Sequence, residues 1–137
     1  MQHRDTTATE KNRGAVAVEF ALVIPFLLLL VAGIVEFAHA MNVQISVTQA
    51  AREAARTYAV TDDWSLATQA GTDGAPSLSG PFSFSKSGDC APNETVTVTA
   101  EYTADSLTGF ALNISGSAVS FAGTFTSTGV GAMRCGG

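Results

Sequence analysis

The run AVAVEFALVIPFLLLLVAGIV, residues 15–35, contains one charged side chain, Glu19. An α-helix needs about 20 apolar residues to cross a hydrocarbon core of about 30 Å. Pro25 predicts a kink and not an end, because other groups in a membrane protein can bond the backbone carbonyl that a proline leaves free. The run therefore predicts a membrane-inserting helix, and we assign the transmembrane segment to residues 15–36.

Charge is distributed unevenly around this run. Arg4, Lys11 and Arg13 precede it, whereas nine of the twelve acidic residues lie beyond Val35. Basic residues close to a span favour the cytoplasmic side of the membrane. We therefore expect residues 1–14 to be a cytoplasmic leader, largely disordered, and the chain beyond the span to be extracytoplasmic.

The pattern changes from apolar to amphipathic after Glu36. Apolar residues then recur at steps of three and four, the period of one helix face: Val43, Val47, Ala50, Ala51, Ala54 and Tyr58. Residues 37–60 are therefore predicted to continue the helix, with one apolar face that packs against a partner element. Arg52 and Arg56 are expected on the solvated face with Glu53, and docking on a partner subunit is the alternative.

Residues 61–137 are predicted to form a small extracytoplasmic β-rich domain, which gives an α+β fold overall. Asp62 and Asp63 are an N-cap signal for a short helix through about Gln69, and a loop at residues 71–81 follows. The period then changes to two, which predicts antiparallel strands with one apolar face. We place strands at residues 82–86, 95–102 and 111–114, a last strand through Val119, Phe121 and Phe125 to about Thr126, and a helical turn or connection at residues 105–110.

Two cysteines, Cys90 and Cys135, lie far apart in the sequence, without a C-x-x-C motif or a nearby histidine. This spacing gives no support to a zinc site or a redox motif. In an exported chain the two residues are expected to form one disulfide, and two free thiols are the alternative.

Composition excludes several classes of function. The net charge is -5 and only 14% of residues are charged, which is unlike a basic nucleic-acid-binding surface. The sequence shows no nucleophile elbow, no phosphate-binding glycine loop and only two histidines. We therefore expect no enzyme, cofactor, metal or small-molecule substrate, and we assign Trp64 and the phenylalanines of the domain to its core.

The head of the apolar run, KNRGAVAVEF, combines three features. Gly14 lets an extended backbone enter a protease site, the apolar run holds that bond at the membrane surface, and Glu19 places a charge where charge is costly. Cleavage between Gly14 and Ala15 would create an α-amino group that the Glu19 carboxylate of an adjacent subunit could neutralise.

This chain resembles the TadE-like pseudopilins of tight-adherence (Flp-type) pilus systems. The resemblance is carried by RGAVAVEFALVIPFLLLL, then GIVEFAHA and QAAREAAR, and it is dense over residues 13–58. Afterwards it is thin, with only Cys90 and the MRC that ends at Cys135 in common. The resemblance implies a pilin-like fold, cleavage by a prepilin peptidase after Gly14, and a pilin-type glutamate at Glu19 followed by Phe20.

The resemblance also implies a role and a set of partners. The role is that of a minor pilin in a surface fibre used for attachment. The partners are other pilin and pseudopilin subunits, the prepilin peptidase, the pilus assembly platform in the membrane, and membrane lipid.

Two plainer interpretations remain open. Ala38-His39-Ala40 fits the cleavage pattern of a secretory signal, although the amphipathic register continues through it unchanged. The second is a permanent single-span anchor that carries a binding domain and does not polymerise.

Two residues near the far edge of the span have expectations of their own. Glu36 is expected to be solvated, with a second interhelical contact as the alternative, and His39 is expected to be interfacial.

Overall fold

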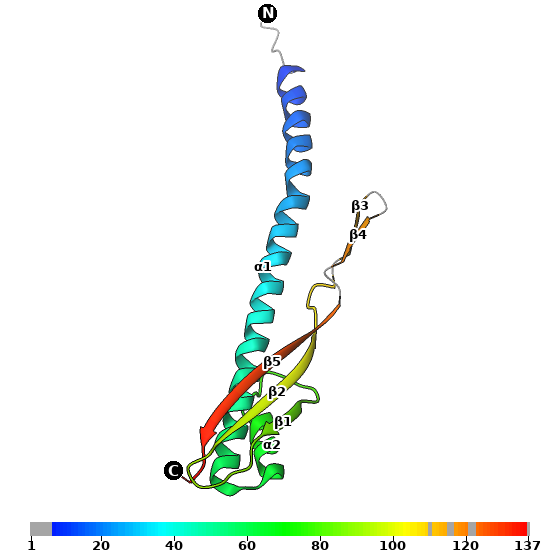
Figure 1. The fold of residues 1–137 in the computed structure, drawn as a ribbon. Coiled ribbons are helices and arrows are strands. Elements are labelled where there is room, and N and C mark those ends of the chain that lie inside the picture. Colours follow the sequence, from blue (N-terminus) through cyan, green and yellow to red (C-terminus); the bar gives the residue numbers. More distant parts are fainter. Residues whose placement is uncertain (1–6, 110, 115–116, 121–122, 137) are drawn as a thin grey trace, which may run out of the picture. The chain divides into compact units, whose positions relative to one another are not determined.

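The structure is a computed structural model that describes residues 7–109, 111–114, 117–120 and 123–136, with side chains described for residues 14–109 and 123–136. The elements are α1 (Thr7–Thr61), α2 (Trp64–Asp73), β1 (Ser83–Ser87), β2 (Thr95–Asp105), β3 (Ala111–Ile114), β4 (Ser117–Ser120) and β5 (Thr124–Arg134) (Figure 1). The chain divides into two compact units, Met1–Val35 and Glu36–Gly137. A long helix followed by short antiparallel strands confirms the predicted α+β class.

The apolar side chains of α1 in the first unit are exposed on every side of the helix. The successive residues 27–30, all leucine, are between 38% and 61% exposed, and Phe26 is 75% exposed. Pro25 lies within α1 and does not end it. A helix that is apolar all round is stable when lipid or other helices surround it. Among the described residues, α1 is the one helix long and apolar enough to cross a membrane, by length and composition alone.

The start of α1 differs from the expectation. The helix begins at Thr7, so the prediction of a disordered leader is wrong for residues 7–13, while residues 1–6 lie outside the described part of the chain. The segment TATEKNR contains residues such as Ala8 and Glu10 that favour helix, and it has no proline or glycine to end one. The adjoining apolar helix can therefore propagate into it.

The second half of α1, in the second unit, buries the face that the sequence predicts. All six residues of the amphipathic pattern are buried, with at most 4% exposure: Val43, Val47, Ala50, Ala51, Ala54 and Tyr58. Three of the six are alanine, so the backbone of a neighbouring element can approach this face closely. The period of 3.6 residues was therefore a sufficient signal for this part of the core.

A three-stranded antiparallel sheet packs on this face, in the order β1-β2-β5. Residues of β2 alternate in burial, with Val96, Val98 and Ala100 buried and the threonines between them partly exposed. β2 pairs along its whole length with β5, from Thr95 opposite Arg134 to Asp105 opposite Thr124. Figure 1 shows both strands running along the second half of α1.

The predicted last strand is wrong in position. The structure has a separate two-stranded sheet of β3 and β4, and then the long strand β5, which starts only at Thr124 and continues to Arg134. Phe121 lies outside the described residues. The sequence TGVGAM looks unfavourable for a strand because glycine has no side chain to pack. Its glycines are required here for a different reason, the closeness of α1.

Gly129 and Gly131 of β5 face the backbone of α1. A Cβ atom at Gly129 would lie 2.5 Å from the carbonyl oxygen of Val47, and one at Gly131 would lie 2.5 Å from that of Ala51. Real Cβ atoms do not come this close, so any larger residue would push the strand away from the helix. The small residues of both elements thus set the distance between sheet and helix.

The segments that precede and connect the strands of the domain match the sequence predictions in part. Asp63 is the N-cap of α2, with its carboxylate accepting from the backbone N–H groups of Ser65 and Leu66 at 2.8 and 3.1 Å. The predicted short helix is confirmed, although it continues to Asp73 and shortens the loop expected at residues 71–81. Of the helical turn or connection expected at residues 105–110, the structure shows a connection over residues 106–109, which form no helix.

Candidate functional site

Gly14 lies inside α1, and nothing around it requires a glycine. A Cβ atom built there meets no atom within 4 Å, in contrast to the close contacts at Gly129 and Gly131. Gly33 is equally open, so openness alone does not mark a processing site. Packing within the described chain therefore gives no reason for a glycine at residue 14.

Glu19 and Phe20 lie on the exposed surface of α1, and Phe20 is 64% exposed. Ala15 and Glu19 are four residues apart, so they lie on the same face of the helix, about 6 Å apart along its axis. Residues 14–38 contain no lysine, arginine or histidine. A side-chain cation that pairs with Glu19 would therefore have to come from outside this stretch.

Glu36 binds a loop instead of being solvated alone. Its carboxylate accepts hydrogen bonds from the backbone N–H groups of Leu107 and Thr108, at 3.1 and 3.2 Å, and from the Thr108 hydroxyl at 3.1 Å. The expectation of a merely solvated carboxylate is therefore wrong. Sequence reasoning could not find this contact, because two of the three donors are backbone groups about 70 positions away that carry no residue-specific signal.

His39 makes a second contact with the same part of the chain. Its Nε2 lies 3.2 Å from the carbonyl oxygen of Asp105, and its ring meets Phe125 edge-on with centroids 6.0 Å apart. A hollow of about 350 Å³ lies beside these groups and is also lined by Leu78 and Tyr102. In the part of the chain that the structure describes, no group of three His, Cys, Asp or Glu side chains could hold a metal ion.

Gln44, which follows His39 on α1, forms hydrogen bonds to β5. Its Nε2 donates to the carbonyl oxygen of Thr128 at 2.9 Å, and its Oε1 accepts from the Ser127 hydroxyl at 2.6 Å. Both polar ends of the amide are therefore bonded. Gln44 was not singled out in the sequence, because a glutamine next to an apolar helix face is usually solvated.

Lys86 joins β1 to the end of α1. Its ammonium group donates to the Tyr58 hydroxyl and to a carboxylate oxygen of Asp89, the latter at 3.2 Å, and it lies 4.4 Å from the centre of the Tyr58 ring. The hydrogen bond to Tyr58 raises the pKa of Lys86 above its usual 10.5, an effect that partial burial opposes and Asp89 assists. Trp64 completes the cluster, edge-on to Tyr58.

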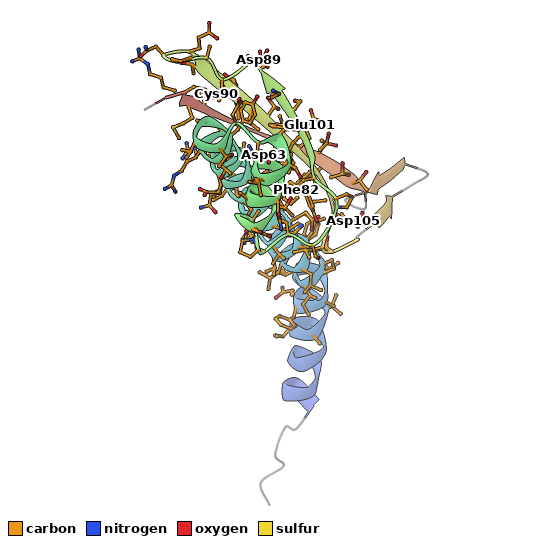
Figure 2. All side chains as sticks on the ribbon, turned by 90° about the horizontal axis from the view of Figure 1, so that it is seen from below. Asp63, Phe82, Asp89, Cys90, Glu101 and Asp105 are labelled. Carbon is orange, nitrogen blue, oxygen red and sulfur yellow. A yellow bond between two sulfur atoms is a disulfide. The ribbon has the colours of Figure 1, made fainter. Side chains whose placement is uncertain are left out.

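The predicted disulfide is confirmed, since Cys90 and Cys135 are bonded with their Cα atoms 5.4 Å apart. Cys135 is buried and lies in one cluster with Val96 and Tyr58. Figure 2 shows Cys90 at the opposite end of the domain from Asp105. The disulfide therefore closes the end of the domain that is remote from the contacts of Glu36 and His39.

Arg52 and Arg56 of α1 lie where expected. Arg52 and Arg56 are exposed, and Arg56 lies 3.8 Å from Glu53 on the solvated face. An exposed pair of this kind contributes little to stability, about 0.3–0.5 kcal/mol for helix neighbours. Both side chains therefore remain available for a partner.

The family model described as TadE-like protein matches residues 14–56 of this chain. The match confirms the resemblance and is consistent with a TadE-like protein of a pilus system. It begins at Gly14, includes Glu19 and Phe20, and ends within the second half of α1. No curated protein and no solved structure matches the chain.

Proposed function

We propose that this protein is a minor pilin, or pseudopilin, that is cut by a prepilin peptidase and takes part in assembly of a tight-adherence pilus, and hence in surface attachment. The observation that carries this proposal is the family match starting at Gly14, on a helix whose apolar surface is exposed all round. A helix of this kind can lie in lipid before assembly and among other helices afterwards. No catalytic chemistry is needed for this role, so the protein acts as a structural subunit and not as an enzyme.

Processing would require the helix to open around Gly14. A protease binds its substrate in an extended form, whereas Gly14 and Ala15 lie within α1. Glycine in a helix interior is about 1 kcal/mol less favourable than alanine, so this point of α1 opens more easily than its neighbours. An open glycine at the edge of the apolar run therefore fits removal of residues 1–14.

Assembly would use the terminus that cleavage creates. The α-amino group of Ala15 is a cation, and the Glu19 carboxylate of a neighbouring subunit is an anion in a segment without other ionisable groups up to Val35. Because an unpaired charge in a low-dielectric surrounding is costly, pairing would fix how far one helix slides along the next. The next residue, Phe20, is exposed and would pack on the neighbouring helix.

The basic residues before the span support a cytoplasmic N-terminus and an extracytoplasmic domain. The Cys90–Cys135 disulfide supports the same orientation, because disulfides persist in oxidising compartments. Within the assembly machinery, the partners would be other pilin and pseudopilin subunits and the assembly platform. Arg52 and Arg56 are exposed and could dock on one of them.

The mass of the mature protein tests the processing step. A start at Ala15 supports the proposal, a start at Met41 indicates a secretory signal, and an intact leader indicates a permanent anchor. Gly14→Val is expected to leave the precursor uncut. Gly33→Val is the matched control, since it changes an equally open glycine of the same helix and should be processed normally.

The assembly step needs variants that keep the membrane segment intact. Glu19→Val should insert into the membrane and fail to enter the fibre. The double variant Val18→Glu/Glu19→Val keeps one carboxylate but turns it by about 100° around the helix, and it should fail in the same way. Val18→Leu is the control. Normal fibre assembly by the Glu19→Val variant would contradict the role of Glu19, and a protein that is never found with pili would be an anchored binding domain.

A further inference from the structure

The loop after β2 is held to α1 at one particular place. Three hydrogen bonds from Leu107 and Thr108 end on the carboxylate of Glu36, and Glu36 directly follows the apolar run that ends at Val35. His39, nearly one turn further on, contacts the carbonyl oxygen of Asp105 at 3.2 Å. The loop and the end of β2 before it are thus fixed to the stretch of helix that follows the membrane span.

This loop exposes an apolar side chain although it is anchored. Leu107 is 61% exposed, while its own backbone N–H group is bonded to Glu36. On α1, Phe37 and Met41 are also exposed, at 69% and 47%. Exposed apolar groups at the end of a span fit a bilayer surface better than water.

The sequence that continues from the loop has no charge. Residues 106–123, from the loop to the start of β5, contain no Asp, Glu, Lys or Arg. The uncharged sequence continues through β5 to Met133, where the strand packs on α1 and pairs with β2. A surface in water normally carries charged residues of both signs. Their absence over such a length is typical of a segment that meets an apolar environment.

The β3–β4 sheet lies inside this uncharged stretch and pairs with no other strand of the described chain. Its register places Leu112 opposite Val119 and Ile114 opposite Ser117. A two-stranded hairpin alone is only marginally stable in water, so contact with a surface outside the described chain would stabilise it.

We propose that the loop at residues 106–109 and the β3–β4 hairpin lie in the interfacial layer of the phospholipid bilayer that α1 enters, held there by Glu36. The protein would then have two contacts with lipid, the span and this second, peripheral one. The proposal rests on membrane insertion of α1, which is part of the proposed function, but not on cleavage or fibre assembly.

Tryptophan fluorescence in vesicles tests the proposal. The chain has one tryptophan, Trp64, so the background is the full-length Trp64→Phe variant. It is reconstituted in phosphatidylcholine vesicles with or without lipid brominated near the headgroup end of the acyl chains. Phe26→Trp reports on the span, Leu107→Trp on the loop, and Val130→Trp, at an exposed position of the three-stranded sheet, is the matched control.

Brominated lipid should quench the Phe26→Trp and Leu107→Trp variants and leave the Val130→Trp variant unquenched. The Leu107→Trp emission should also lie at shorter wavelength than that of Val130→Trp. If Phe26→Trp is quenched and Leu107→Trp is not, insertion stands and the second contact is disproved. An emission of Leu107→Trp that shifts with the protein-to-lipid ratio, without quenching, would show that a second copy of the chain covers the loop and would equally overturn the proposal.

The role of Glu36 has its own test in the Leu107→Trp background. Glu36→Ala removes the acceptor of all three hydrogen bonds, so quenching at position 107 should fall as the loop leaves the interface. Glu53→Ala, which removes a carboxylate on the solvated face of α1, should not change it. Equal quenching with and without the Glu36 carboxylate would rule out the anchoring.

Discussion

A Cβ atom on Gly131 would lie 2.5 Å from the carbonyl oxygen of Ala51, and Gly131 is therefore in direct contact with the backbone of α1. Ala51 is itself fully buried. Gly129 and Val47 repeat the relationship one helical turn away. Two glycines on a strand and a row of small residues on a helix thus form the closest packing between the two elements.

Gly131→Ala should destabilise the domain by about 1–3 kcal/mol, the usual cost of forcing extra volume into a packed core. The methyl group meets backbone atoms of α1, which cannot rotate away as a side chain could. Urea unfolding of the full chain in detergent, followed by Trp64 fluorescence, measures the change. Gly123→Ala is the control, because a Cβ atom there meets nothing within 4 Å, and an equal effect of both variants would contradict the packing argument.

How much of the fold could be predicted from the sequence depends on whether the packing contacts are made by side chains that form a pattern. The buried face of α1, from Val43 to Tyr58, was predictable because side chains of one kind recur with the period of a helix. The strand β5 was missed because its packing depends on the absence of side chains at Gly129 and Gly131. No periodic pattern marks a strand of this kind.

The candidate site divides in the same way. Gly14 and Glu19 stand out in the sequence because a glycine and a carboxylate are unusual at the edge of an apolar run. The hydrogen-bond partners of Glu36 do not stand out in the sequence. Its carboxylate bonds the backbone of a loop, and the position of that loop depends on the whole sheet. Contacts from side chain to backbone between distant segments are therefore the part of this structure that sequence patterns did not reveal.

Removing the disulfide should lower the free energy of unfolding by about 4 kcal/mol on the chain-entropy model, given the sequence separation of 45 between Cys90 and Cys135. The variant that tests this is the double substitution Cys90→Ala/Cys135→Ala, which leaves no free thiol to exchange. Its urea midpoint should be well below that of the oxidised protein. Reduction of the unmodified protein should give a similar loss, and an unchanged midpoint in both cases would contradict a stabilising role.

Asp63→Ala should destabilise α2 by about 1 kcal/mol, because the backbone N–H groups of Ser65 and Leu66 lose the carboxylate that they bond. The loss is measured as a lower urea midpoint, with Trp64, the first residue of α2, as the probe. Asp73→Ala is the matched control at the other end of α2. A negative charge near a helix C-terminus is unfavourable, so this substitution should cost nothing.

Lys86 should make stability depend on pH in the alkaline range. Its pKa is raised above 10.5 in the folded protein, first by the hydrogen bond to Tyr58 and also by Asp89, with burial acting in the opposite direction. A raised pKa means that the folded state binds the proton more tightly than the unfolded state does. The contribution is therefore fully present below pH 10.5 and is lost as the pH rises through the higher, folded pKa.

Three proteins separate this effect from other alkaline changes: the unmodified chain, Lys86→Met and Lys86→Arg. At neutral pH the Lys86→Met variant should unfold at lower urea than the unmodified chain, because no cation remains beside Tyr58 and Asp89. As the pH rises above 10.5 that difference should shrink, whereas Lys86→Arg should keep its stability relative to Lys86→Met because arginine stays charged. A difference between the unmodified chain and Lys86→Met that is constant over the whole range would show that the charge of Lys86 does not stabilise the fold.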